Sequence, residues 1–195
     1  MSNVILTFAL AYLIGSIPFG FLLTKFFAKQ DIRDIGSGNI GATNVLRTGN
    51  KALAALTLIL DGGKGAFAVF ILPFLLPFGV SPLAIGLFAM IGHCFPIWLK
   101  FKGGKGVATS LGVLLAAAPW VGLAACGAWL ASAFLFRISS LAALVAIGLA
   151  PLFAFFIYGA VPAGICAVIA ALVFWRHKDN IARLLKGEEP KIGKK

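Results

Sequence analysis

Charged side chains are scarce in this sequence, and acidic ones are scarcer still. They make up 12% of the 195 residues, whereas a soluble domain carries roughly a quarter. The acidic residues number only 6 and are spread along the chain, so they form no clustered set of carboxylates for a hard metal ion. A soluble globular fold and a site built around metal-bound phosphate are therefore excluded, and we expect neither a metal nor a cofactor.

The sequence also lacks the features of disulfide-bonded or zinc-binding proteins, of outer-membrane β-barrels and of cleaved signal peptides. Cys94, Cys126 and Cys166 each stand alone in an apolar segment, which is typical of small core residues and not of a disulfide or zinc site. The apolar runs lack the alternation of outer-membrane β-strands. No basic residue precedes the first apolar run, so we expect no cleaved signal peptide.

What the sequence does have is apolar residues and positive charge. Hydrophobic residues make up 61% of it, and the formal net charge is +11. This composition predicts an all-α integral membrane protein, a polytopic helical bundle that forms one domain over residues 1–195. The charge favours anionic lipid headgroups and phosphorylated substrates as partners. We expect no nucleic acid, because that partner would need a soluble basic domain.

Six apolar segments approach or exceed the roughly 20 residues that cross a bilayer. They cover residues 4–23, 52–78, 83–99, 107–136, 141–158 and 160–175. We expect a kink or a close-packing point in the first of them, at residues 15–20. The basic residues that follow this first segment indicate the cytoplasmic side, which places the N-terminus outside.

The number of crossings depends on residues 107–136, which Pro119 interrupts. One crossing there gives six spans and places Arg137 on the opposite side from the other basic loops. Two short crossings give seven spans and a cytoplasmic C-terminus, with all of these cations on the cytoplasmic face. The positive-inside rule favours seven, although such short crossings would have to thin the bilayer or stop part-way.

Three polar stretches separate or follow the apolar segments, and the first covers residues 36–47. Its glycines allow tight turns and bring backbone N–H groups close to a ligand, and Arg47 supplies a fork-shaped cation that suits phosphate. These features indicate an anion cradle, although ordinary turns use the same small residues. The candidate ligand-binding residues in this stretch, besides Arg47, are Ser37, Gly38, Asn39, Gly41, Thr43 and Asn44.

The second polar stretch covers residues 100–109, where Gly103, Gly104 and Gly106 surround Lys105. A glycine-rich turn that opens an apolar helix directs N–H groups and the positive end of the helix dipole toward an anion. The stretch is not a P-loop, because Gly106 follows the lysine where Ser or Thr is required. A positive-inside loop would explain the flanking lysines but not this glycine spacing.

The third stretch covers residues 176–189, where His177 and Asn180 have helical spacing and should share one face. The alternative is a basic amphipathic tail that rests on anionic lipid. Another charged pair, Asp61 and Lys64, lies inside the second apolar segment. It is either part of a functional site or a salt bridge within one helix. His93 lies in an apolar run, and we expect it to be structural.

Together these stretches resemble a known family. Residues 36–44 (GSGNIGATN), 92–96 (GHCFP) with 101–109 (FKGGKGVAT), and 177–188 (HKDNIARLLKGE) are similar to the three motifs of the bacterial acyl-phosphate-dependent glycerol-3-phosphate acyltransferases. The early GSIPFG and the Asp61/Lys64 pair also match, and the resemblance covers nearly the whole chain.

The resemblance implies transfer of a fatty acyl group from acyl phosphate to the 1-hydroxyl of sn-glycerol 3-phosphate. The products would be lysophosphatidic acid and inorganic phosphate, at the first committed step of phospholipid synthesis. It also implies a multi-pass protein of the bacterial cytoplasmic membrane, with its active site facing the cytoplasm. The implied partners are the two substrates and the lipid bilayer.

The resemblance assigns roles by residue. The catalytic set is His177, Asn180, Lys105 and Arg47. Besides the polar and glycine residues of the first stretch, the substrate-binding set includes Gly103, Gly104, Gly106 and Lys64. Glu188, His93 and Asp61 would be structural, with Glu188 ordering the tail. The base is either His177 or the donor's own phosphate, and we favour the phosphate.

Rival functions fit less well. Neither histidine is followed by an Asp at the spacing of His-x4-Asp acyltransferases, since Trp98 and Ala182 stand there. No Ser–His–Asp triad is evident. A transporter or channel for organic phosphates is the alternative from another class. It would line a path across the membrane with charges, whereas nearly all the cations here fall on one predicted face.

Overall fold

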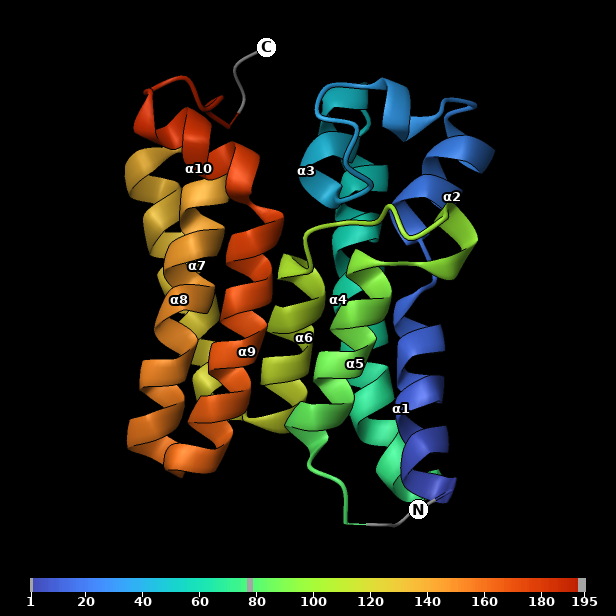
Figure 1. The fold of residues 1–195 in the computed structure, drawn as a ribbon. Helices are drawn as coiled ribbons and strands as arrows, with labels where there is room; N and C mark the ends of the chain where they lie inside the picture. Colours follow the sequence, from blue (N-terminus) through green and yellow to red (C-terminus); the bar gives the residue numbers. More distant parts are fainter. Residues whose placement is uncertain (1, 77–78, 193–195) are drawn as a thin grey trace. The chain divides into compact units, whose positions relative to one another are not determined.

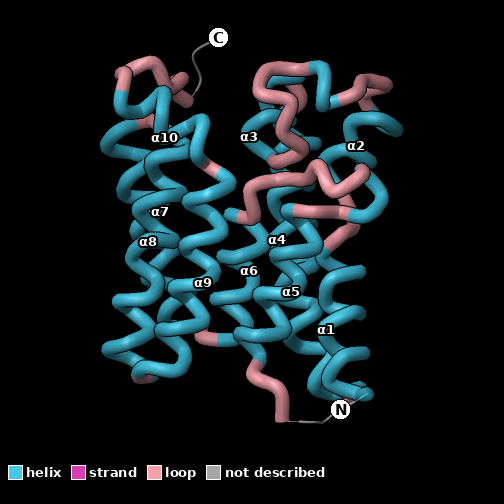
Figure 2. The backbone as a smooth tube through the Cα atoms, viewed as in Figure 1, coloured by secondary structure: helices cyan, strands magenta, loops and turns pink. Residues whose placement is uncertain are grey.

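The computed structural model describes residues 2–76 and 79–192, and these residues form ten α-helices and three short 3-10 helices without a strand. The prediction of an all-α integral membrane protein is confirmed. The chain divides into two compact units, Met1–Ala117 and Ala118–Lys195. Figure 1 shows the fold, and Figure 2 separates its helices from its loops. Whether one domain spans the chain stays a prediction.

The first unit is built around one long helix. Its α-helices are α1 (Ser2–Gly15), α2 (Phe19–Phe27), α3 (Ala42–Val45), α4 (Lys51–Leu75), α5 (Pro82–Cys94) and α6 (Val107–Ala117), and its 3-10 helices are η1 (Ile32–Asp34), η2 (Leu46–Thr48) and η3 (Ile97–Leu99). Helix α4 packs against α1, α5 and α6. Within this unit, the loops that join α2 to α4 and α5 to α6 lie at the same end (Figure 1).

The kink expected in the first span is a full break between α1 and α2. Ser16 Oγ donates to the carbonyl of Tyr12 at 2.7 Å, and Pro18 precedes α2 without a side-chain cap. Helix α1 packs very closely on α5 here, since a Cβ on Gly15 would lie 1.8 Å from the carbonyl oxygen of Ala89. Small residues permit this backbone approach between membrane helices.

Helix α4 runs without interruption through the charged and glycine-rich sequence 61–65. Asn50 caps its start, with Oδ1 accepting from the N–H of Leu53 at 3.0 Å. The helix ends at Leu75. We expected the span to continue to Phe78, and residues 77 and 78 lie outside those that the structure describes.

Pro119 divides residues 107–136 into α6 and α7 (Pro119–Phe136), with Ala118 between them at φ −146° and ψ 72°. Proline is well suited to the first turn of a helix, because no intrahelical partner is needed there for its missing N–H. The 11 residues of α6 are about 16 Å long at the usual helical rise, roughly half of a hydrocarbon core. The count of seven crossings stays a prediction.

The second unit packs three long helices and a short terminal one. Helix α8 (Ser139–Tyr158) contacts both α7 and α9 (Ala160–Arg176), and α10 (Lys178–Leu185) follows α9. The tail then returns to the junction of α7 and α8, where the N–H of Ile192 donates to the carbonyl of Arg137 at 2.6 Å. Arg137 and the basic tail therefore lie at the same end of this unit (Figure 1).

Length and composition identify five described segments that can cross a membrane. They are Asn3–Phe27, Lys51–Leu75, Pro82–Leu99, Pro119–Phe136 and Ser139–Tyr158. The bent pair of α9 and α10 makes a sixth if it is taken as one span, and α6 is a shorter apolar helix. These segments agree in position with the six predicted from the sequence. Of the fourth predicted segment, residues 107–136, only Pro119–Phe136 is long enough to be counted as a span.

Candidate active site

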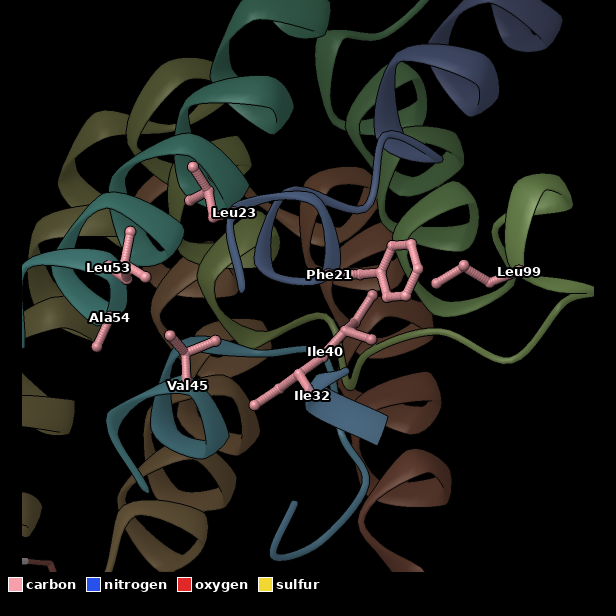
Figure 3. Close-up of a cluster of buried hydrophobic side chains, with 8 residues drawn as sticks. All are labelled: Phe21, Leu23, Ile32, Ile40, Val45, Leu53, Ala54 and Leu99. Atoms are coloured by element: carbon pink, nitrogen blue, oxygen red, sulfur yellow. The ribbon is translucent and has the colours of Figure 1, made fainter. Parts of the chain in front are cut away.

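A buried apolar cluster joins the first two polar stretches in the first unit. Figure 3 shows its side chains converging from α2, α4 and the two loops. Leu99, which leads into the second stretch, shares the cluster with Ile40 and Val45 of the first. The full set is Phe21, Leu23, Ile32, Ile40, Val45, Leu53, Ala54 and Leu99. The two stretches are therefore anchored to one common core at one end of the unit.

Asn44 organises the first stretch from within. Its side chain is buried, and Nδ2 lies within hydrogen-bonding distance of three backbone carbonyls: Ile32 at 3.1 Å, Ile35 at 2.8 Å and Asn39 at 2.9 Å. Its Oδ1 accepts from the N–H of Ser37 at 3.1 Å. Both ends of its amide therefore contact the loop backbone, and the expected contact of Asn44 with substrate stays a prediction.

Arg47 lies against the loop and remains exposed. Its Nη1 is 3.4 Å from Asn44 Oδ1, and a Cβ on Gly36 would come within 2.6 Å of the same nitrogen. Gly36 also has φ +55°, so this position needs glycine for its backbone and for the space beside Arg47. Ser37 and Thr43 are exposed on the same loop. Arg47, Ser37 and Thr43 are therefore exposed candidates for contact with a ligand.

A second arginine nearby is already occupied. The guanidinium of Arg33 pairs with the carboxylate of Asp31 and lies 4.8 Å from the ring centroid of Phe21. The hydrogen bond from Arg33 lowers the pKa of Asp31 to about 2. Arg47 is therefore the better candidate for a ligand phosphate in this stretch.

The second stretch folds back on the end of α5. The N–H of Gly103 donates to the carbonyl of Cys94 at 3.2 Å, and that of Gly104 donates to the carbonyl of His93 at 3.1 Å. Gly106 has φ +82° and leads directly into α6. Lys105 is half-buried between two buried glycines, so the position of its backbone is set on both sides.

His93 packs directly beneath this loop. A Cβ on Gly104 would lie 2.0 Å from His93 Nε2, so Gly104 rests on the imidazole ring without room for a side chain. On its other side, His93 Nδ1 lies 3.6 Å from Asp61 Oδ1. His93 is thus buried between Asp61 and Gly104, and its structural role stays a prediction.

Asp61 and Lys64 form a buried salt bridge of 2.7 Å, one of the two alternatives left open by the sequence. Lys64 Nζ also donates to the carbonyl of Ile17 at 2.7 Å, and both charged side chains are 2% exposed. We expected Lys64 to bind substrate. The structure places its ammonium between two protein partners and away from solvent, and its role toward substrate stays a prediction.

The third stretch belongs to the second unit and bends at His177. Helices α9 and α10 meet there at 66°, His177 is the N-cap residue of α10, and Asn180 lies in the first turn of α10. That the two side chains share one face stays a prediction. Both side chains are buried. His177 Nδ1 lies 2.8 Å from the carbonyl of Val173. Because a carbonyl can only accept, Nδ1 carries the hydrogen, and Nε2 has the lone pair in the neutral ring.

Glu189 holds this stretch together. Its carboxylate accepts from Ser140 Oγ at 2.7 Å, Asn180 Nδ2 at 2.5 Å and Arg183 Nε at 2.7 Å. Burial raises the pKa of Glu189, but these hydrogen bonds lower it more, so the net shift is downward. The carboxylate is therefore held in its charged form beside Asn180.

Comparison with known proteins identifies the family of this chain. A model of the family described as glycerol-3-phosphate acyltransferase matches residues 5–187. The chain belongs to the glycerol-3-phosphate acyltransferase family. The glycerol-3-phosphate acyltransferase of Jannaschia sp. (strain CCS1) is 58% identical, over 97% of this chain and 93% of its own length. That of Caulobacter vibrioides (strain NA1000 / CB15N) is 60% identical, over 94% and 85%.

Solved structures agree with this assignment. The crystal structure of PlsY (YgiH), an integral membrane glycerol 3-phosphate acyltransferase, in its glycerol 3-phosphate form, matches with a TM-score of 0.90 and 40% identity. The match covers 99% of this chain and 96% of that one. The lysophosphatidic acid form matches with a TM-score of 0.87 and 39% identity. This chain is accordingly a membrane acyltransferase, and the family recognised from its three stretches is confirmed.

Sequence reasoning missed Glu189, whose carboxylate contacts Asn180 and Arg183 in the tail of this acyltransferase. We expected Glu188 to order the tail; its side chain is exposed, and that role stays a prediction. Ser140, which donates to the Glu189 carboxylate, was missed entirely. The sequence carries no signal for either, because adjacent glutamates look alike and Ser140 lies far from the tail along the chain.

Proposed function

We propose that this chain transfers a fatty acyl group from acyl phosphate to the 1-hydroxyl of sn-glycerol 3-phosphate. The products are lysophosphatidic acid and inorganic phosphate, at the first committed step of phospholipid synthesis. The observation that carries the proposal is the match over 99% of the chain to an acyltransferase crystallised in glycerol 3-phosphate and lysophosphatidic acid forms. The three stretches that resemble the acyl-phosphate-dependent family support this choice of donor.

Arg47 and Lys105 bind phosphate groups in this proposal. Two phosphorylated substrates repel each other, and fixed cations with nearby backbone N–H groups offset that repulsion. Arg47 is exposed and Lys105 is partly exposed, on the two loops that share one end of the first unit (Figure 1). Ser37 and Thr43 are the further exposed side chains for substrate, and Asn44 keeps the first loop in shape.

The chemistry needs no nucleophile from the protein. The 1-hydroxyl oxygen attacks the acyl carbonyl carbon, the ester bond forms, and the bond from that carbon to the phosphate oxygen breaks. Phosphate leaves with the electron pair. Because the donor is already activated, positioning and charge stabilisation can supply most of the rate.

The hydroxyl proton passes to the donor's own phosphate, and His177 with Asn180 holds a substrate at the reaction centre. Both side chains are held in place by protein contacts, His177 through Nδ1 and Asn180 through Glu189. A pH–rate profile of His177→Ala tests the assignment. Activity should fall without loss of a pKa from the profile, and disappearance of a pKa would make His177 the base instead.

The active site faces the cytoplasm of a bacterial inner membrane in this proposal. The polar loops and the tail carry cations in both units, including Arg47 and Lys105 in the first and Arg137 and Arg183 in the second. Within the first unit, the two loops with Arg47 and Lys105 lie at one end (Figure 1). The positive-inside rule makes such an end cytoplasmic, where both phosphorylated substrates would be soluble or bound at the inner leaflet.

The decisive experiment measures release of inorganic phosphate by the purified protein from acyl phosphate, with and without glycerol 3-phosphate, and with acyl-CoA as a parallel donor. Release that depends on glycerol 3-phosphate, accompanied by lysophosphatidic acid and without use of acyl-CoA, is the expected result. A folded, lipid-supplied protein that releases none would overturn the proposal and direct attention to phosphate transport.

The same assay tests the phosphate-binding residues. Lys105→Ala and Arg47→Ala should remain folded and lose about 10²–10³-fold in kcat/KM, as for removal of a preorganised charge-stabilising group. Lys102→Ala is the matched control for Lys105, since it lies on the same loop and its side chain is exposed. Wild-type kinetics for glycerol 3-phosphate in either Lys105→Ala or Arg47→Ala would remove that residue from the phosphate site.

A further inference from the structure

Three polar side chains form a buried cluster that the reaction proposed above does not use. Asp61 and Lys64 lie on α4, and His93 lies near the end of α5. All three are nearly inaccessible, at 2% exposure for the side chains of Asp61 and Lys64 and 4% for His93. Buried charges are costly to retain in a membrane protein, so we expect this cluster to have a function.

On one side, the cluster holds the break in the first span. Lys64 Nζ donates to the carbonyl of Ile17, which lies between α1 and α2, while it also bonds Asp61. The ammonium lies 5.7 Å from the ring centroid of Phe19, the first residue of α2. Lys64 thus ties α4 to the start of the segment that leads into the first polar stretch.

On the other side, the cluster supports the loop that carries Lys105. His93 Nδ1 faces the Asp61 carboxylate at 3.6 Å, and its Nε2 side is in contact with Gly104. The carbonyl of His93 also accepts the N–H of Gly104. Both the ring and the backbone of His93 therefore set the position of the residue immediately before Lys105.

We propose that Asp61, Lys64 and His93 are a positioning cluster that holds the Gly103–Gly106 loop, and through it Lys105, in place for phosphate binding. The inference rests on the function proposed above for Lys105. Its physical basis is the contact of His93 with Gly104, because a shift of the ring displaces the backbone of the residue immediately before Lys105. Misplacement of a binding group by about 1 Å is enough to reduce a rate by roughly 10²-fold.

A purely structural role would behave differently under substitution. A buried ion pair can often be exchanged for apolar residues of similar size without loss of stability, whereas removal of one partner alone leaves an uncompensated charge. The double variant Asp61→Leu with Lys64→Met therefore removes the charges without leaving either unpaired. Gly63→Ala is the control on the same helix, because a Cβ there would meet nothing within 4 Å.

The measurements are the thermal midpoint in detergent and kcat/KM for glycerol 3-phosphate. We expect the double variant to keep a midpoint close to that of wild type and to lose at least ~10-fold in kcat/KM, while Gly63→Ala keeps wild-type activity. A folded double variant with wild-type kinetics overturns the inference. If that variant does not fold, His93→Ala replaces it. It keeps the ion pair and removes the ring beneath Gly104, and the same loss is expected.

To test whether the cluster acts through Lys105, the cluster substitutions are combined with Lys105→Ala. If the cluster acts by placing Lys105, its substitution should reduce the residual activity of Lys105→Ala by less than ~2-fold, since groups that act as a unit are not additive. An equal loss in both backgrounds would overturn the inference. Wild-type activity of Lys105→Ala alone would instead overturn the proposed role of Lys105, so the two failures are distinguishable.

Discussion

Glu189→Gln is the substitution for which the structure gives the sharpest expectation. The carboxylate is 7% exposed and accepts hydrogen bonds from Ser140, Asn180 and Arg183. An amide keeps one acceptor oxygen and turns an N–H₂ group toward the other donors. Hydrogen bonds to a charged partner are each worth about 1.5–3 kcal/mol. Loss of one or two of them should therefore destabilise the protein by about 3 kcal/mol.

Thermal unfolding in detergent measures this loss. One kcal/mol corresponds to roughly 2–4 °C for a chain of this length, so the midpoint should fall by about 6–12 °C. Glu188→Gln is the matched control, because it makes the same chemical change at the neighbouring, exposed side chain. It should change stability by no more than ~0.5 kcal/mol. Equal midpoints for the two variants would refute the reasoning.

The pH dependence of the thermal midpoint tests whether the charge of Glu189 stabilises the protein. The pKa of Glu189 in the folded protein lies below its ordinary value of 4.5, so its stabilisation is complete above that ordinary value and is lost as the pH falls through the folded pKa. The difference in midpoint between wild type and Glu189→Gln should therefore be constant near neutral pH and shrink under acid conditions. A difference that does not change with pH would mean that the charge of Glu189 contributes nothing.

Other substitutions test the loops. Asn44→Ala should make the loop between α2 and α4 markedly more sensitive to limited proteolysis and should lower activity, because its amide lies within hydrogen-bonding distance of three carbonyls. Asn39→Ala should have the smaller effect, because it loses one hydrogen bond, from the N–H of Gly41. Arg33→Gln should retain activity within ~2-fold while Arg47→Gln loses nearly all of it, because an exposed ion pair such as Arg33–Asp31 contributes little. A cysteine placed next to Pro119 should be labelled from outside the cell, and labelling from the cytoplasm alone would exclude seven crossings.

Local signals in the sequence predicted much of the fold. Apolar length placed the spans, the Gly-Ser-Ile-Pro sequence marked the break before α2, and Pro119 marked the start of α7. The spacing of Asp61 and Lys64 allowed the salt bridge that the structure contains. Each of these features depends on residues close together in the chain, where backbone sterics and helical periodicity decide the outcome.

The features that were missed depend on residues far apart. Gly104 rests on His93, and Ser140 bonds Glu189 across most of the second unit's sequence. The bend at His177 likewise comes from how α10 leaves α9, which helical spacing alone does not reveal. A single sequence gives no measure of which distant pairs pack together, so it could name the polar stretches but not the contacts that shape them.

The burial of a side chain helps to distinguish residues that contact substrate from residues that hold the loops in place, whereas a sequence motif contains both kinds. Asn44 and Lys64 were both assigned to substrate on the same footing as Ser37 and Arg47. The first two are buried with their polar atoms bonded to the protein, whereas Ser37 and Arg47 are exposed. In a membrane protein with few charges, a buried polar group must have partners within the protein, and those same partners hold it away from substrate. We therefore propose that the phosphates in the first unit are met by Arg47 and Ser37, which are exposed, and by Lys105, which is half-buried. In this proposal Asn44 and Lys64 hold the loops in place.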